Sequence, residues 1–303
     1  LEELHAEVDD HQALLDILRR KTDLADSPEA RIALLERQAQ ICEDHTGDLV
    51  AAIDAYEQVL GEQDTRREGY EALRRLYAKA ERWPDLSATL ERQLEAGAGD
   101  PVEVRYELGR VSLQRLNDAY VALDHLREAL ALDSGHEPSI ALLESMMAQD
   151  EHRGDAAEIL EPVFLSRMDW PKVTSTLEAR ISSTDAPEDK KPLLAKLGQI
   201  HEDYLEDLEG ALAVYIRLFQ SDPADRGSWE TLARLSRILE SHDAVAAAYG
   251  GVIERGGVVD EDTAALGRMA GRLYDDKLGD AEHATGIWTK VLEFEPTDRE
   301  AFE

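Results

Sequence analysis

The sequence predicts an all-α protein, a right-handed α-α superhelix of about 15–17 antiparallel helices stacked as hairpins. Three observations support this fold class. Strong helix formers dominate the composition, apolar side chains recur four residues apart, and one residue pattern repeats along the chain without gaps. With 43% hydrophobic and 32% charged residues among 303, the chain can bury a continuous core beneath solvated helix faces.

The repeat is clearest in four segments that align with one another without a gap. In each segment a small residue is followed thirteen positions later by an alanine, and large apolar residues follow four, eight and eighteen positions after that alanine. Because residues four apart lie about one helical turn apart, the first two large side chains share one buried face. The positions in order are Ala39, Ala52, Tyr56, Leu60 and Tyr70; Gly109, Ala122, Leu126, Leu130 and Ile140; Gly198, Ala211, Tyr215, Phe219 and Trp229; and Gly271, Ala284, Trp288, Leu292 and Phe302.

The small residues predict that the two helices of each hairpin approach closely, because a larger side chain would push them apart. Short polar breaks such as Asn117-Asp118 and Leu278-Gly279-Asp280 separate the two helices. Asp222-Pro223 and Glu295-Pro296 follow the second helix, which ends there because proline cannot continue the hydrogen-bond ladder. Spacing, capping residues and helix breakers therefore predict the same hairpins.

A second kind of hairpin alternates with the first, and its clearest copy carries Tyr70, Tyr77 and Trp83. Residues 11–39 also match residues 170–198 without a gap. The working repeat thus contains four helices in about seventy residues, two hairpins of about thirty-five each. The packing positions expected in the core include all four tryptophans: Trp83, Trp170, Trp229 and Trp288.

This pattern resembles the tetratricopeptide repeat. That family has two antiparallel helices per repeat of about 34 residues, with a Leu-Gly pair in the first helix and an alanine early in the second. An aromatic residue follows one turn later, and a proline closes the repeat. The resemblance covers nearly the whole chain and implies a concave groove lined by the first helix of each hairpin. It is carried by Leu108-Gly109 and Leu197-Gly198; Ala52, Ala122 and Ala211; Tyr56, Tyr215 and Trp288; and Pro223 and Pro296.

Two features depart from the family pattern. The spacing of thirteen from the small residue to the alanine is one more than the family's usual value, which predicts a lengthened turn. The interval from Ala122 to Ala211 is 89 residues, against 70 and 73 for its neighbours. This excess of about one helix predicts an irregular extra-helix step near residues 137–182, with a kink in the superhelix. We therefore expect an N-terminal part of the array, residues 1–150, and a C-terminal part, residues 151–303.

The net charge of −32 argues against a nucleic-acid partner and against an anionic membrane surface, since both reward clusters of lysine and arginine. No stretch approaches the roughly twenty apolar residues that a membrane-spanning helix needs. The chain begins Leu1-Glu2-Glu3, without an initiator methionine or a signal segment, so we expect a piece of a longer protein. Scarce lysine beside abundant arginine and alanine indicates a bacterial source, and a cytoplasmic location is favoured.

No constellation of residues indicates catalysis, so we expect no enzyme activity, cofactor, metal site or small-molecule substrate. The nine histidines are scattered without a His-Glu-x-x-His motif, and there is no glycine-rich phosphate loop. The single cysteine, Cys42, falls on an apolar helix face, where burial is expected. The acidic residues Glu202-Asp203 and Glu206-Asp207 could attract a divalent cation weakly, but a solvated helix face is the expected interpretation.

Basic and amide residues mark one stripe on the first helices of the hairpins. Four arginines there, on so acidic a chain, indicate a groove for an acidic peptide or a C-terminal carboxylate, which arginine binds with two parallel hydrogen bonds. The alternative is an ion pair within each helix, since Glu71 and Glu230 lie four residues before Arg75 and Arg234. The candidate partner-binding residues are Gln40, Arg75, Arg110, Gln199, Arg234 and Arg272.

The sequence therefore favours a protein–protein interaction scaffold that binds a partner peptide or protein in the concave groove of the array. A structural spacer or oligomerisation arm of a larger protein is the alternative, and an enzyme built on an α-superhelix is a remote one. The surface distinguishes the first two functions. A binding protein should show a cleft with apolar and arginine anchors, whereas a spacer should show an evenly polar surface.

Overall fold

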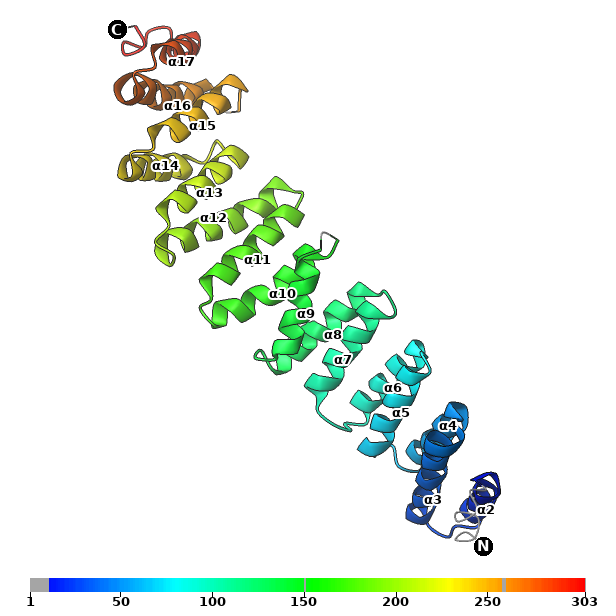
Figure 1. The fold of residues 1–303 in the computed structure, drawn as a ribbon. Helices are drawn as coiled ribbons and strands as arrows, with labels where there is room; N and C mark the ends of the chain where they lie inside the picture. The colour runs from blue at the N-terminus through cyan, green and yellow to red at the C-terminus, as the bar shows by residue number, and fades with distance from the viewer. Residues whose placement is uncertain (1–10, 150, 258–259, 303) are drawn as a thin grey trace. The chain divides into compact units, whose positions relative to one another are not determined.

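The computed structural model describes residues 11–149, 151–257 and 260–302. Within these ranges the chain forms sixteen α-helices and no β-strand, which confirms the predicted all-α fold (Figure 1). None of these helices is both long enough and apolar enough to cross a membrane. The elements are α2 (His11–Asp23), α3 (Pro28–Ile41), η1 (Cys42–Thr46), α4 (Leu49–Glu62), α5 (Arg67–Lys79), α6 (Trp83–Glu95), α7 (Pro101–Gln114), α8 (Ala119–Leu132), α9 (Glu137–Met147), α10 (Arg153–Ser166), α11 (Trp170–Ser183), α12 (Pro187–Asp203), α13 (Leu208–Ser221), α14 (Arg226–Leu239), α15 (His242–Glu254), α16 (Asp260–Arg272), η2 (Leu273–Leu278) and α17 (Ala281–Phe294), where η1 and η2 are short π-helical segments.

The chain divides into two compact units, an N-terminal unit of Leu1–Met146 and a C-terminal unit of Met147–Glu303. In the N-terminal unit, α2 is followed by the hairpins α3/α4, α5/α6 and α7/α8. The C-terminal unit contains the hairpins α10/α11, α12/α13, α14/α15 and α16/α17. The division lies a few residues before the boundary that we placed after residue 150. The extra-helix step and the kink expected near this point stay predictions.

Small residues bring the two helices of a hairpin together, as the repeat predicts. Ala39 on α3 and Ala52 on α4 are completely buried. A Cβ atom on Gly109 of α7 would lie only 2.9 Å from Cγ of Leu126 on α8, and one on Gly198 would lie 2.8 Å from a tyrosine ring. Because protein interiors are close-packed, any larger side chain at these positions must displace the second helix.

The lengthened turn has one geometry in the four hairpins α3/α4, α7/α8, α12/α13 and α16/α17. Eight positions after the small residue, one residue adopts the left-handed helical conformation. The next residue is an aspartate whose carboxylate accepts a hydrogen bond from the backbone N–H three positions on. The aspartate's own N–H donates to the carbonyl oxygen six positions back, so one turn ends the first helix and begins the second. The turn pairs are Gly47-Asp48 (φ 70° at the first residue), Asn117-Asp118 (55°), Glu206-Asp207 (53°) and Gly279-Asp280 (64°).

Replacing Glu206 with glycine is expected to raise the free energy of unfolding by about 0.5–1 kcal/mol. A side chain in the left-handed region costs about 1–2 kcal/mol, and the flexibility of glycine in the unfolded chain offsets only part of that cost. The matched control is Gly47→Glu at the equivalent turn, where a Cβ atom meets no neighbour within 4 Å and only backbone strain is added. Urea denaturation followed by circular dichroism should show opposite signs for the two variants, and equal signs would contradict this account.

The hairpins α5/α6, α10/α11 and α14/α15 have a shorter turn. Glu81, Met168 and Glu240 occupy its left-handed position, at φ 55°, 55° and 54°. Two positions later the second helix begins with a ring-bearing side chain, which therefore lies at the end of the hairpin rather than within its helical layers. These side chains are Trp83, Trp170 and His242.

The expectation that all four tryptophans lie in the core is correct only for Trp229, which is 5% exposed. Trp83, Trp170 and Trp288 are half-buried. Trp170 stacks on a tyrosine with ring centroids 3.9 Å apart, and Trp288 donates a hydrogen bond to a carboxylate near the hairpin turn. Trp83 and Trp170 lie at hairpin ends, which protein covers on fewer sides than a helix crossing, whereas Trp288 lies within α17 against Gly271 of α16. Phe302, expected to open a further helix, instead lies exposed in a turn.

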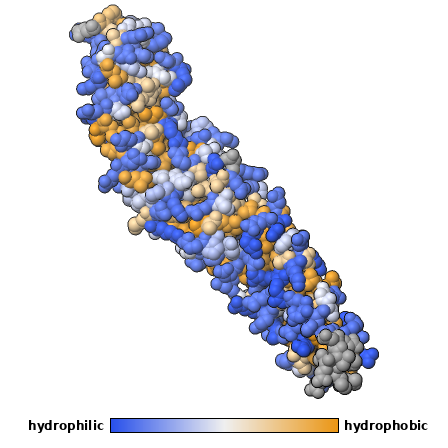
Figure 2. Space-filling model, viewed as in Figure 1, coloured by the Kyte–Doolittle hydropathy of each residue, from blue (hydrophilic) through white to orange (hydrophobic). Residues whose placement is uncertain are grey.

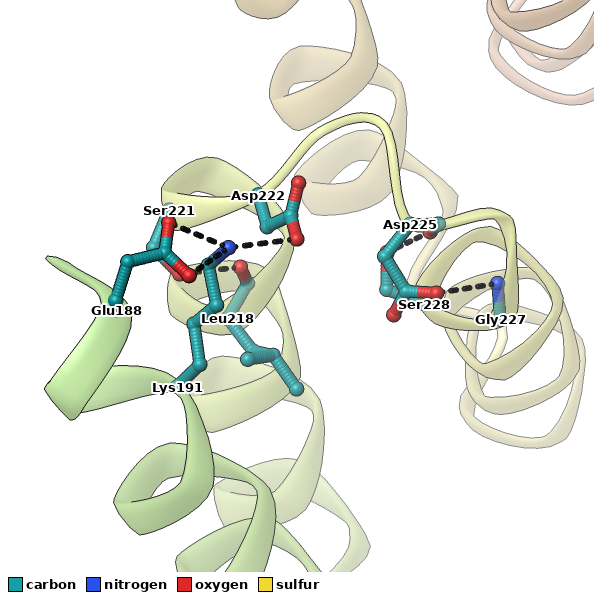
Figure 3. A network of polar contacts seen from close by, with 8 residues as sticks. All are labelled: Glu188, Lys191, Leu218, Ser221, Asp222, Asp225, Gly227 and Ser228. Atoms are coloured by element: carbon teal, nitrogen blue, oxygen red, sulfur yellow. Dashed lines mark hydrogen bonds and ion pairs between the residues drawn. The ribbon is translucent and has the colours of Figure 1, made fainter.

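The end of α13 shows how a proline and polar side chains fix a helix boundary (Figure 3). The helix ends at Ser221, immediately before Asp222-Pro223, as predicted. The ammonium group of Lys191 on α12 lies 2.8 Å from Asp222 and 3.0 Å from Glu188, so it ties α12 to the end of α13. Asp225 then caps α14 by accepting a backbone hydrogen bond at 3.1 Å.

Candidate functional site

The six candidate residues lie on the first helices of six hairpins, three in each unit. Every one of these side chains is exposed or half-buried. Within each unit they occupy consecutive hairpins, so each unit carries its own row of three. The N-terminal row is Gln40 on α3, Arg75 on α5 and Arg110 on α7; the C-terminal row is Gln199 on α12, Arg234 on α14 and Arg272 on α16.

Carboxylates of the preceding hairpin hold two of these arginines. Arg75 forms two parallel hydrogen bonds with Glu43, at 3.1 Å from Nε and 2.5 Å from Nη2. Arg234 binds Glu202 in the same two-pronged way, with Nη1 at 2.7 Å and Nη2 at 2.9 Å from the carboxylate oxygens. The alternative interpretation, an ion pair with a glutamate one turn earlier in the same helix, is therefore wrong for both arginines.

The other two arginines are also beside carboxylates. Arg272 binds Glu300, with Nη2 2.7 Å from one oxygen. Arg110 lies 3.3 Å from Glu107, a carboxylate that Arg74 also contacts. Ion pairs this exposed contribute about 0–1 kcal/mol each to stability, so they orient the arginines more than they stabilise the fold. An anionic partner reaches these guanidinium groups only by displacing or sharing a carboxylate.

Both units carry the same four side chains around the ion pairs Arg75–Glu43 and Arg234–Glu202. The match of residues 11–39 with 170–198 continues without a gap, so each residue through position 98 corresponds to the residue 159 positions later. Burial raises the pKa of both tyrosines in the set, so their hydroxyl groups stay protonated. The extended match is the sequence signal that identifies the glutamate partners. The two sets are Gln40, Glu43, Tyr56 and Arg75, and Gln199, Glu202, Tyr215 and Arg234.

The C-terminal unit contains a cleft of about 520 Å³ lined by α14, α15, α16 and η2, here called the α14–α16 cleft. Met269 and Leu273 supply apolar lining, and Arg272 of the candidate row lies at the cleft. Figure 2 shows hydrophobic side chains, in orange, among hydrophilic ones on the surface of this unit. A concave site of this size, with apolar lining and a few polar groups, is typical of ligand-binding pockets.

The cleft opens because its residues are shorter than their N-terminal counterparts. Ala233 stands where the N-terminal unit has Arg74, and Ser236 stands where it has Tyr77. Ser236 puts a hydroxyl at a buried position where the N-terminal unit has an aromatic ring, and Ala233 shortens a half-buried one. The cleft beyond Arg272 was not predicted, although comparing the two repeats position by position would have revealed the missing side-chain volume.

Basic side chains gather at this cleft. Arg237 and Lys277 line it, and in the part of the chain that the structure describes neither makes an ion pair or a side-chain hydrogen bond. Glu240 is the carboxylate at the same cleft, and Nδ1 of His242 lies 2.8 Å from the Ser236 hydroxyl. Two unpaired cations beside one carboxylate give the cleft a local positive charge on a protein whose net charge is −32.

The described residues contain no group of three or more His, Cys, Asp or Glu side chains placed to hold a metal ion. Cys42 is buried, as expected, and burial raises the pKa of its thiol.

No family model matches the chain, and no curated protein sequence does. Similar solved structures include the C-terminal part of a TPR repeat-containing protein from Cytophaga hutchinsonii, at 15% identity over 88% of this chain and 97% of that one, with a TM-score of 0.27. YrrB, described as a TPR protein with an unusual peptide-binding site, is 17% identical over 65% of this chain and 90% of its own, with a TM-score of 0.29. The TPR2AB domain of yeast Sti1, in a complex with pHSP90, is 14% identical over 82% of this chain and 99% of its own, with a TM-score of 0.32.

The chain's own helices carry the features of the repeat. Paired antiparallel helices, buried small residues where they cross, and aspartate-capped turns recur along both units. Proline follows the second helix where the repeat predicts it, after α13 and α17. The chain therefore has a tetratricopeptide-type fold of stacked helical hairpins.

Proposed function

We propose that this protein is an interaction scaffold and that the α14–α16 cleft binds a peptide segment of a partner protein. The observation that carries this proposal is the combination of an apolar-lined cleft with the unpaired cations Arg237 and Lys277 on a strongly acidic chain. A spacer needs only a soluble surface, and its natural surface on this chain would be acidic throughout. A cleft of reversed charge is better suited to a partner with carboxylates.

The candidate residues take different parts in this proposal. Arg272 lines the cleft and is the one that we propose as a direct partner contact. The other five, Gln40, Arg75, Arg110, Gln199 and Arg234, stay predicted partner contacts. Arg75 and Arg234 already hold glutamates with two hydrogen bonds, so an acidic partner would have to compete with those glutamates. We propose a binding function and no catalytic one.

Charge reversal at the cleft is expected to reduce capture of the native partner at least about tenfold, which corresponds to about 1.4 kcal/mol of binding free energy. The variant is Arg237→Glu with Arg272→Glu, introduced into the native protein and tested by affinity capture and mass spectrometry at two salt concentrations. Because charge-assisted contacts are screened by salt, capture by the unmodified protein should also fall as salt rises.

The matched control is Arg127→Glu together with Arg217→Glu, two exposed arginines on the second helices α8 and α13 that bind carboxylates at 2.7 Å and 2.6 Å. This control makes the same change in net charge away from the cleft and should capture the partner at full strength. If both double variants lose the partner equally, net charge rather than the cleft controls binding. If neither loses it, the cleft is not the binding surface.

A further inference from the structure

We propose that the α14–α16 cleft receives an aromatic side chain of an acidic partner peptide, in the place that Trp83 occupies in the N-terminal unit. The inference rests on the proposed function and names the chemistry of the ligand. It follows from comparing two equivalent groups of three helices, α5, α6 and α7 in one unit and α14, α15 and α16 in the other.

The two groups share their register and their turn geometry. Arg75 and Arg234 occupy the same position on α5 and α14, and both bind the preceding hairpin. Glu81 and Glu240 occupy the left-handed turn position in the two hairpins. The small residue of the repeat is Gly109 on α7 and Gly271 on α16. These glycines are 162 positions apart, so residues of α7 are compared with those 162 positions later. The two groups therefore correspond position by position in sequence, although Arg115 follows the end of α7 whereas Lys277 lies in the π-helical segment η2.

In the N-terminal unit the chain's own side chains fill this space. The guanidinium carbon of Arg115 lies 4.5 Å from the centre of the Trp83 ring, in a cation–π contact. Arg74 forms an ion pair with Glu107 across the two first helices. The ring of Tyr77 on α5 is also buried, and its hydroxyl donates a hydrogen bond to Glu57 on α4. A tryptophan ring covered by a guanidinium group thus completes this surface of the N-terminal unit.

In the C-terminal unit the equivalent positions hold shorter side chains. Ala233 replaces the arginine of the ion pair, Ser236 replaces the buried tyrosine, and His242 replaces the tryptophan. All three of these shorter residues line the cleft. The space that remains is the cleft of about 520 Å³, which is wide enough for a large aromatic side chain.

The C-terminal unit keeps a cation at the position of Arg115 but has no tryptophan at the position of Trp83. Lys277 stands at the position of Arg115, and within the described residues no aromatic ring lies beneath its ammonium group. Met269 stands at the position of Glu107 and presents a thioether, a group that packs well against aromatic rings. A ligand ring in the cleft would restore the cation–π contact with Lys277 and cover Met269 and Leu273.

The charge around the cleft indicates which residues of the partner peptide lie next to its aromatic side chain. Arg237 stands where the N-terminal unit has Ala78, so this group of helices has gained a cation at the rim. Acidic residues on either side of the aromatic side chain would pair with Arg237 and Lys277. A second copy of this chain is a poorer occupant, because two chains of net charge −32 repel each other.

The test uses three fluorescein-labelled peptides of equal length, measured by fluorescence anisotropy with the complete protein. The first has one tryptophan between pairs of acidic residues, the second has alanine in place of tryptophan, and the third has lysines in place of the acidic residues. The tryptophan acidic peptide should bind at least about tenfold more tightly than either of the others. Equal affinity for the tryptophan and alanine peptides would overturn the inference.

Filling the cleft provides the second arm of the test. The variant Ser236→Tyr with His242→Trp restores the N-terminal side chains and should weaken binding of the tryptophan peptide at least about tenfold. Lys277→Glu, an exposed change that leaves the packing alone, should do the same and serves if the filled variant does not fold. The matched control is Arg115→Glu at the equivalent position of the N-terminal unit, which should leave affinity unchanged within about twofold. Full affinity in Lys277→Glu would also overturn the inference.

These outcomes separate this inference from the proposed function. If the peptides fail to discriminate but native partner capture is lost in Arg237→Glu with Arg272→Glu, the cleft binds its partner without an aromatic anchor. If native capture survives that charge reversal, the proposed function at this cleft is itself wrong. Sedimentation velocity completes the test, because self-association that disappears in the filled variant would identify a second copy of the chain as the occupant and overturn the inference.

Discussion

Replacing Trp229 with alanine is expected to lower the free energy of unfolding by about 3–5 kcal/mol, as truncation of a large core side chain does. Trp229 is 5% exposed, and its indole N–H donates a hydrogen bond of 2.8 Å to the carbonyl oxygen of Pro223. Its own carbonyl oxygen accepts from the hydroxyl of Tyr249 at 3.0 Å. The substitution therefore leaves a cavity between α13, α14 and α15 and removes the donor to the Pro223 carbonyl oxygen, whereas the bond from Tyr249 is made to the backbone and stays. Urea denaturation followed by far-ultraviolet circular dichroism measures the loss.

The control is Trp83→Ala, which the repeat pattern alone would rank as an equal loss. Trp83 is half-buried at a hairpin turn, and one of its faces is covered by the side chain of Arg115 rather than by a helix. Its truncation should cost about 1–2 kcal/mol, because less apolar area leaves water on folding and little cavity remains. A Trp83→Ala loss as large as that of Trp229→Ala would mean that the hairpin end is as tightly packed as the core.

The contrast between these two tryptophans shows what the repeat pattern can predict. Helix boundaries are set locally, by an aspartate that caps the next helix and a proline that cannot continue the last one. Those signals are visible in sequence, and they placed the turns at Asn117-Asp118 and the stop at Asp222-Pro223 correctly. How many neighbours cover a ring is not local. It depends on the residues of the next hairpin, so apolar character at a repeat position does not establish burial.

The candidate site was predictable to a similar extent. The spacing of the repeat placed all six candidate residues on first helices, and it identified Arg272 at what proved to be a cleft. It did not identify the partner of Arg75, because Glu43 lies on the preceding hairpin and the rule of pairing within a helix considers only near neighbours. The cleft itself arises from absent side-chain volume at Ala233 and Ser236, which no single-residue motif signals.

The second large effect concerns the helix crossings. Replacing Gly109 with leucine is expected to lower the free energy of unfolding by about 3 kcal/mol, the upper end of the usual cost of overpacking. The first added carbon would lie 2.9 Å from Cγ of Leu126 and 3.2 Å from the carbonyl oxygen of Ala122, and Leu126 is itself fully buried. With no space to receive the rest of the side chain, α7 and α8 must separate. Thermal and urea unfolding of the variant would both shift to milder conditions.

The control for this prediction is Gly286→Ala, an exposed glycine within α17 that has no neighbour within 4 Å of the added Cβ atom. Alanine favours the helix over glycine by about 0.5–1 kcal/mol, so this variant should be stabilised. The two substitutions thus have opposite expected signs, since both enlarge a helical glycine and only one meets a facing helix. Loss of stability in Gly286→Ala would show that helix flexibility, rather than close approach, is what these glycines provide. A stable Gly109→Leu variant would mean that α8 can shift away from α7 at little cost, and the small residue of the repeat would then not be required for the hairpin.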